Sequence, residues 1–183
     1  MSRVGRNPIP IPPEVKLKIE GNKVEVEGPK GKLSRIFHPD MEISEVSEKA
    51  YVLRPSDKWI HRSLHGLTRT LLANMINGVS KGFEKDLELQ GMGYRVQRQG
   101  EKLILQVGYS HPVEVSPPPG ISFEVSGNRI RVSGLDKETV GEVAAQVRRV
   151  HPPDHYKGKG IRYVGERIRL KPGKAGKAVG KKG

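Results

Sequence analysis

Apolar and polar residues alternate along VKLKIEGNKVEVEG (residues 15–28), with one interruption at Gly21-Asn22. Successive side chains of a strand point to opposite faces, and Gly-Asn is typical of a tight turn between two strands. The stretch therefore predicts a β-hairpin with one buried face. The same alternation predicts further strands at 33–37, 43–46 and 50–54.

The spacing of apolar residues changes after Pro55-Ser56-Asp57, which has the chemistry of a helix start. From there to Gly82, apolar residues recur every three or four positions, as on one face of a helix. The spacing predicts one long amphipathic helix that covers the sheet. Its expected apolar stripe is Ile60, Leu64, Leu67, Leu71 and Met75.

The second half of the chain repeats this order of elements. An offset of 70 residues superposes 17–33 on 87–103, and an offset of 79 superposes 46–58 on 125–137. The difference between the offsets predicts a longer loop around SHPVEVSPPPG. An offset of 106 aligns IEGN with VSGN more closely, but it leaves the long helix without a counterpart, so the offsets that keep the order of elements are preferred.

A second helix completes the repeat. Its apolar stripe ends at the helix-breaking sequence His151-Pro152-Pro153. The stripe consists of Val140, Val143, Ala144, Val147 and Val150.

These elements predict an α+β protein with two tandem similar domains, each a small, mainly antiparallel sheet packed against one helix, followed by a basic C-terminal arm. The expected boundaries are 1–82 for the first domain, 83–171 for the second domain with the arm, and 172–183 for a flexible basic tail. Most of the patterned apolar residues are then core.

The charge of the chain indicates what kind of partner it binds. The 183 residues include 33 Lys and Arg against 20 Asp and Glu, for a formal net charge of +13, and residues 154–183 hold ten of the cations but only two acids. Such a balance implies a polyanionic partner, either a nucleic acid or the rival, an anionic membrane. The absence of cysteine, of a signal-peptide core and of any apolar run of 18 residues predicts a soluble cytoplasmic protein without disulfides.

The sequence contains no convincing motif for a catalytic, metal-binding or nucleotide-binding site. His61 and His65 have the i, i+4 spacing that can hold a metal, but no Glu follows His61 and no third ligand is apparent, so a polar helix face is preferred and no metal is expected. The G-x-G sequences in GMGYR and GKGIRYVG lack the remaining residues of a nucleotide-binding loop. No nucleophile, base and orienting acid occur together, and no cofactor is expected.

The arm carries the chemistry of a phosphate-binding surface. In YKGKGIRYVGE (156–166), glycines allow close approach of the backbone, Lys and Arg supply charge, and Tyr156 and Tyr163 can stack on bases or ribose. The alternative is a solvated tail of charged residues. Ile168 and Leu170 alternate with cations, which favours an ordered strand with one packed side and one basic side, and only the chain from Pro172 is expected to be flexible.

A second cluster lies in GMGYRVQRQG, which places Tyr94, Arg95 and Arg98 beside glycines at a predicted hairpin. It is interpreted either as a loop that touches RNA or as a simple tight turn. GYSHP at 108–112 is a weaker case of the same kind.

PDHYKGKGIRYVGERIRLKPGK resembles the C-terminal signature of the bacterial large-subunit ribosomal protein six family. SRVGRNPIPIP, VEVEGPKGKL, GMGYR and VGYSHPV extend the resemblance over almost the whole chain. It implies a structural protein of the large ribosomal subunit in the cytoplasm, without catalytic activity. It also implies binding to 23S ribosomal RNA, mainly through the second domain, near the stalk base, with neighbouring ribosomal proteins and translation factors close by.

Carried over by position, the resemblance implies two groups of RNA-contacting residues. The arm contributes Lys157, Lys159, Arg162, Tyr163, Arg167, Arg169 and Lys171, and the weaker candidates are Gly91, Gly93, Tyr94, Arg95, Ser110 and His111. The chain extends past Lys171 with a Gly/Lys/Ala tail that has no assigned role.

We expect neutralisation of Lys157, Lys159 and Arg162 to flatten the salt dependence of RNA binding, and Val at Gly158 or Gly160 to impair binding without loss of stability. The rivals are a nucleic-acid chaperone or DNA-compacting protein, a metal-dependent nuclease using His61 and His65, and a basic domain with an idle tail.

Overall fold

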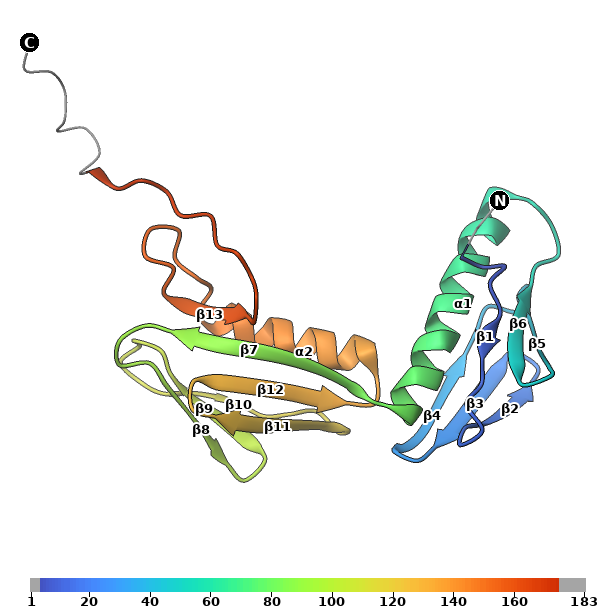
Figure 1. The fold of residues 1–183 in the computed structure, drawn as a ribbon, viewed down its shortest axis with the longest axis horizontal. Helices are drawn as coiled ribbons and strands as arrows, with labels where there is room; N and C mark the ends of the chain where they lie inside the picture. The colour runs from blue at the N-terminus through green and yellow to red at the C-terminus, as the bar shows by residue number, and fades with distance from the viewer. Residues whose placement is uncertain (1–3, 175–183) are drawn as a thin grey trace, which may run out of the picture. The chain divides into compact units, whose positions relative to one another are not determined.

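The computed structural model describes residues 4–174, and the predicted flexible tail lies largely outside the described residues, since 175–183 are not among them. The chain forms two compact units (Figure 1). Unit 1 extends to Phe83 and includes the short segment Gly134–Lys137, and unit 2 comprises Glu84–Ser133 and the chain from Glu138 onward. Each unit is an α+β fold and is described by itself.

Unit 1 contains two three-stranded sheets and one helix. The sheets have the orders β1-β6-β5 and β2-β3-β4, and their pairings are antiparallel. The elements are β1 (Ile9–Pro10), β2 (Lys16–Glu20), β3 (Lys23–Gly28), β4 (Gly31–Ile36), β5 (Glu42–Val46), β6 (Lys49–Leu53) and α1 (Trp59–Ser80).

The core of unit 1 forms where the alternation of the strands meets the helix. Val24 and Val26 of β3 and Leu72 of α1 are fully buried in one cluster with residues of β5 and β6. The predicted hairpin is β2–β3, in which Leu17 lies opposite Val26. Alternation thus predicted β2 to β6 correctly, whereas the two-residue strand β1 was not predicted.

The predicted apolar stripe of α1 is correct only in part: Met75 is buried and Leu64 and Leu71 pack against the core, but the other two predicted residues are exposed. Ile60 is 45% exposed and Leu67 is 53% exposed, whereas the buried line runs through His65, Thr68 and Leu72. Both lines have helical spacing, and the sequence favoured the more apolar one. The buried line is possible because the ring of His65 finds polar partners inside, with Nε2 2.9 Å from the carbonyl oxygen of Val52 and Nδ1 3.2 Å from Arg54.

The start of α1 also differs from the predicted cap. Lys58 occupies the N-cap position without a side-chain cap hydrogen bond. The carboxylate of Asp57 pairs with Arg54 instead, and Ser56 Oγ accepts a long, 3.4 Å bond from the Lys58 backbone N–H. The helix ends where expected, with Gly82 at φ +77° just beyond it.

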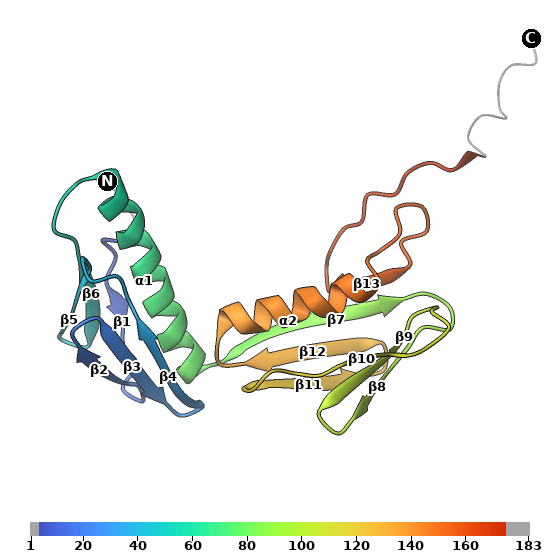
Figure 2. The same ribbon diagram turned by 180° about the vertical axis from the view of Figure 1, so that it is seen from behind.

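Unit 2 repeats the plan with one added strand. Its sheets have the orders β10-β9-β8 and β11-β12-β7-β13, and α2 lies along the four-stranded sheet in both views (Figures 1 and 2). The elements are β7 (Phe83–Gln90), β8 (Arg95–Gln99), β9 (Lys102–Gln106), β10 (Val113–Val115), β11 (Ile121–Ser126), β12 (Arg129–Gly134), α2 (Lys137–Val150) and β13 (Gly160–Tyr163).

The strand pairings show that the predicted alignment of the two halves at an offset of 70 residues is wrong. That offset superposed the β2–β3 hairpin on β7 and β8, but β7 pairs with β12 and β13, whereas β8 pairs with β9. The counterpart of β2–β3 is β8–β9, since Gly21 and Gly100 occupy the same turn position at φ +61° and +63°. One offset of 79 residues therefore relates both halves, and the prediction of a longer loop around SHPVEVSPPPG is wrong, because this part of the chain has no insertion relative to unit 1.

The β5–β6 turn is a place where stability can be gained. Ser47 and Glu48 have φ of +51° and +59°, values that favour Asn-Gly in a two-residue hairpin and cost roughly 1 kcal/mol or more for other residues. We expect the double substitution Ser47→Asn/Glu48→Gly to raise the free energy of unfolding by about 1 kcal/mol, measured by urea denaturation.

The control is Glu45→Gly inside β5, which should lower stability by about 0.5–1 kcal/mol. A double variant no more stable than the wild type would show that the turn is not strained.

Candidate nucleic-acid interface

The arm begins as part of the sheet of unit 2. β13 pairs with β7 in antiparallel register, with Ile161 opposite Leu89, and Ile161 is fully buried. The backbone N–H of Ile161 also donates to the carbonyl oxygen of His151 at 2.8 Å. Residues 160–163 are thus held in the fold on both sides, unlike a solvated tail.

A closed loop precedes β13 and presents Lys157 and Lys159. The carboxylate of Asp154 accepts the Lys157 backbone N–H at 3.0 Å, and the Asp154 backbone N–H donates to the Lys159 carbonyl oxygen at 2.8 Å. The hydrogen bond from Lys157 lowers the pKa of Asp154. Lys157 is exposed and Lys159 is half-buried.

Gly160 is required by packing. A Cβ at this position would lie 2.7 Å from the carbonyl oxygen of Pro152 and 2.7 Å from Cα of Pro153, and its φ is +147°. At Gly158, with φ +69°, a Cβ would meet only Leu170, at 3.6 Å. The structure therefore revises the expectation that Val at Gly160 spares folding, because a larger residue there meets backbone that cannot move aside.

Two half-buried ion pairs fix the arm. Glu166 accepts two hydrogen bonds from Arg148 of α2, at 2.6 and 3.1 Å, and one from the Tyr163 backbone N–H at 3.1 Å. The bonds from Arg148 lower the pKa of Glu166 and raise that of Arg148. Arg162 contacts Glu88 of β7 at 2.5 Å. The charge of Arg162, predicted to contact RNA, is thus largely neutralised within the protein.

The alternating segment after β13 is not a strand. The Glu166 backbone N–H bonds to the Tyr163 carbonyl oxygen at 3.0 Å, which turns the chain away from β7 and ends the pairing. Ile168 is half-buried but Leu170 is 57% exposed, so the predicted packed side exists only in part. The basic side does exist, since Arg167, Arg169 and Lys171 are all exposed.

The weaker candidates come together at the end of α2. The chain from Gly91 to Tyr94 links two different sheets and is not the predicted hairpin. Tyr94 Oη lies 3.3 Å from His151 Nε2, and a Cβ at Gly91 would lie 2.9 Å from the Tyr94 ring. Arg95 is exposed beside this loop, as is Gly93.

The loop that carries Ser110 and His111 meets the same point. Tyr109 donates its hydroxyl to the carbonyl oxygen of Val150 at 2.8 Å, and its ring centroid lies 5.7 Å from that of His151. Ser110 and His111 are exposed at the tip. His151 thus joins the arm and both loops, although the sequence marked it only as the end of a helix.

Tyr109 and His151 were missed as site residues. The signal for Tyr109 is its position between Gly108 and Ser110 in the candidate loop GYSHP, but nothing local identifies His151, since its neighbours come from distant parts of the chain.

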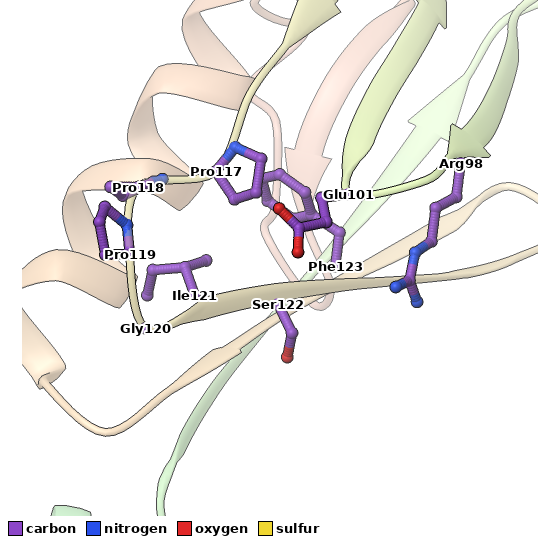
Figure 3. Close-up of a pocket in the computed structure, with 9 residues that line it drawn as sticks. All are labelled: Arg98, Glu101, Pro117, Pro118, Pro119, Gly120, Ile121, Ser122 and Phe123. Atoms are coloured by element: carbon purple, nitrogen blue, oxygen red, sulfur yellow. The ribbon is translucent and has the colours of Figure 1, made fainter.

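Arg98 does not join this cluster. It lies with Glu101 across a pocket of about 410 Å³ from the loop Pro117–Gly120 (Figure 3). Its Nε donates to the carbonyl oxygen of Gly100 at 2.8 Å. None of the residues that line this pocket belongs to the arm or to the loops around His151.

The electrostatic result is a basic surface whose nearby acids are already bound. Asp154, Glu166 and Glu88 accept hydrogen bonds from the protein. The exposed cations face solvent and can neutralise phosphates, and the exposed rings can stack. These cations are Arg95, Arg149, Lys157, Arg167, Arg169 and Lys171.

The two helix histidines have separate protein partners. His61 contacts Ser56 Oγ through Nδ1 at 2.7 Å and Asp40 through Nε2 at 3.2 Å, while both ring nitrogens of the buried His65 contact Arg54 and Val52. Residues 4–174 contain no group of three or more His, Cys, Asp or Glu side chains arranged to hold a metal. Within the same range, no helix has the length and hydropathy needed to span a membrane.

Comparison with known proteins gives the family. The sequence model of the family described as Ribosomal protein L6 matches residues 11–82 and 90–164, two segments whose starts differ by the offset found in the fold. The chain is 57% identical over 183 residues to the large ribosomal subunit protein uL6 of Caldicellulosiruptor bescii, covering all of both chains. It is 60% identical over 178 residues to uL6 of Geobacillus stearothermophilus, covering 97% of this chain and 100% of the relative.

A third relative, uL6 of Thermomicrobium roseum, is 56% identical over 184 residues, again with both chains fully covered. The family match covers more than half of the chain and agrees with the two repeated units. The chain therefore belongs to the ribosomal protein L6 family, whose members are structural, non-enzymatic components of the large ribosomal subunit.

Proposed function

We propose that this protein binds 23S ribosomal RNA through unit 2 and stabilises the tertiary structure of that RNA. The observation that carries the proposal is the arm, which is paired into the sheet at β13 while Lys157, Arg167, Arg169 and Lys171 remain exposed. Because the backbone that carries these cations is held before binding, less backbone entropy is lost when the side chains meet phosphates.

Two further parts of the proposal rest only on what the resemblance of the C-terminal signature implies. The binding site lies near the stalk base and the region where translational GTPases bind, and neighbouring ribosomal proteins and translation factors are close. In this setting the arm neutralises phosphates that would otherwise repel as RNA segments approach one another. The protein thus acts by positioning RNA.

The assignment of the remaining candidates follows from their exposure. Lys157, Arg167, Arg169 and Lys171 contact phosphates directly, with Lys159 beside them. Tyr163 is half-buried, with the guanidinium of Arg148 5.8 Å from its ring centroid, so it acts mainly by holding the arm. Arg162 has a structural role with Glu88.

The salt dependence of binding tests the role of the cations. We expect Lys157→Gln/Arg167→Gln/Arg169→Gln to reduce the slope of log affinity against log salt by about 0.7–0.9 for each phosphate that is no longer neutralised, measured by filter binding to 23S ribosomal RNA. The matched control is Lys16→Gln/Lys18→Gln/Lys49→Gln, which removes the same charge from lysines on the surface of unit 1. An equal change of slope in both triples would mean that net charge, and not the arm, sets the affinity.

Gly160 tests whether the arm must be held against unit 2. We expect Gly160→Ala to lower the free energy of unfolding by about 1–3 kcal/mol, because the methyl group would displace Pro152 and Pro153, and to weaken RNA binding. Gly141→Ala is the control, since Gly141 lies in α2 with open space around it. This substitution should raise the free energy of unfolding by about 1 kcal/mol. Thermal denaturation of both variants gives the comparison, and a Gly160→Ala protein of unchanged stability would contradict the packing argument.

The pair of Glu166 and Arg148 predicts a pH dependence. The pKa of Glu166 is lowered in the folded protein from an ordinary value of 4.5, so its contribution to stability is full above that pH and is lost as pH falls through the lower folded value. We expect Glu166→Gln to destabilise the protein at about pH 7, with a difference from wild type that shrinks toward about pH 3.

Urea denaturation across this range measures the difference. Glu114→Gln is the control, because Glu114 is an exposed partner of Lys102 at 3.4 Å and should give little difference at any pH. A difference for Glu166→Gln that stayed constant with pH would show that the carboxylate charge does not stabilise the arm.

A further inference from the structure

The exposed large apolar side chains of unit 2 gather around the candidate interface. Among the described residues of this unit, all of them lie in the arm segment or in the two loops that meet at His151, and none lies on the outer faces of its strands or on α2. They are Met92, Tyr109, Tyr156, Val164 and Leu170. Apolar side chains make no favourable contact with phosphates, so a surface that bound only the RNA backbone would not need them.

Tyr109 is held as a rigid, half-exposed ring. Its hydroxyl donates to the carbonyl oxygen of Val150. Val150 is the last residue of α2, so no N–H group within the helix donates to this oxygen. One side of its ring contacts His151, and the ring of His111 lies nearly parallel, at 21° with 6.4 Å between centroids. With its hydroxyl fixed, the ring remains 50% exposed and loses little freedom if a base stacks on it.

Met92 is presented in a different way. It is 87% exposed at the tip of the loop between Gly91 and Gly93, while the base of this loop is held by Tyr94, whose ring contacts His151 with 5.4 Å between centroids. An unbranched, polarisable side chain in this position suits insertion between bases. Because Tyr94 and Tyr109 both contact His151, the two loops are fixed to one point.

We propose that unit 2 binds RNA where bases are unstacked, with an unpaired base stacked on the Tyr109–His111 ring pair and Met92 inserted beside another base. This inference rests on the proposed RNA binding and names the kind of RNA that the site takes. Continuous A-form helices bury their bases and are bound through phosphates and 2′-hydroxyl groups, whereas loops and bulges expose base faces.

The charge around these side chains favours RNA over a protein partner. Arg95 follows Tyr94 directly and Arg149 directly precedes Val150, which accepts the hydrogen bond of Tyr109, and both arginines are exposed. The acids Asp154, Glu88 and Glu166 are bound internally. A base stacked on Tyr109 thus has cations near it for its own phosphate. An exposed apolar surface without such cations would fit a protein partner better.

Competition between unpaired and paired RNA tests the inference on the full-length protein. Bound 23S ribosomal RNA is displaced with poly(A) or with the poly(A)·poly(U) duplex at equal nucleotide concentration. We expect poly(A) to compete at least about 5-fold better than the duplex. The preference should disappear in Tyr109→Leu, which keeps an apolar side chain but removes the ring.

Two further variants separate stacking from folding. Tyr109→Phe keeps the ring and should keep the preference, and Met92→Ala, at a position too exposed to matter for folding, should weaken binding to 23S ribosomal RNA by about 3- to 10-fold with an unchanged salt slope. Ile36→Ala is the matched control, since Ile36 is 75% exposed in unit 1. If Tyr109→Leu does not fold, the competition on the wild type and the affinity of Met92→Ala still test the inference.

Equal competition by both RNAs, or unchanged affinity of Met92→Ala, overturns the inference while the RNA binding of the wild type stands. A wild type that does not bind 23S ribosomal RNA at low salt overturns the proposed function itself. Unchanged RNA affinity together with poorer incorporation of the Met92→Ala protein into reconstituted large subunits would assign the surface to a protein partner and would also overturn the inference.

Discussion

Four residues of β13 pair with β7 and bury Ile161 completely, and this pairing fixes the arm to the fold of unit 2. On one side, backbone hydrogen bonds and the contact of Arg162 with Glu88 hold the strand to the sheet. On the other side, the Ile161 backbone N–H bonds to the carbonyl oxygen of His151, at the end of α2. A chain segment with so many glycines would otherwise have a high conformational entropy to lose on binding.

The same pairing decides which charges are available. The acids that lie near the arm are occupied by hydrogen bonds from Lys157, Arg148 and Arg162, whereas most of the arm's cations have no such role and remain exposed. The protein thereby presents a positive surface without having to remove all acids from the region. The carboxylates hold the arm in the fold, and the exposed cations of the arm leave it positively charged.

Alternation and helical spacing were sufficient to predict the α+β class, the two similar units and most strands. A strand or helix that is buried on one face has apolar residues at a regular spacing, and this spacing can be read from the sequence. In α1, Ile60 and Leu67 were wrongly expected to be buried and His65 was missed, since His65 becomes a core residue only through Val52 of β6 and Arg54, which no local pattern shows. The offset of 70 failed for a similar reason. Any shift that keeps the alternation in phase superposes strands, and only the pairing of β7 with β12 and β13 distinguishes them.

The candidate site shows the same limit. Glycines, cations and tyrosines identified the arm and the loops at Gly91 and Ser110 one by one. Their meeting at His151 required the fold, and so did the finding that Arg162 is paired and Gly160 is packed.

The break at Pro152-Pro153 has a wider consequence. In unit 1 the helix runs for 22 residues and β1 has a single neighbour in its sheet, whereas in unit 2 the helix stops after 14 residues and the chain returns to give β7 a second neighbour. Two copies of one plan thus differ chiefly in the segment that lies beyond the helix. The segment beyond the shorter helix thus adds β13 and the basic arm at one edge of the sheet, and the strand order that both units share stays the same.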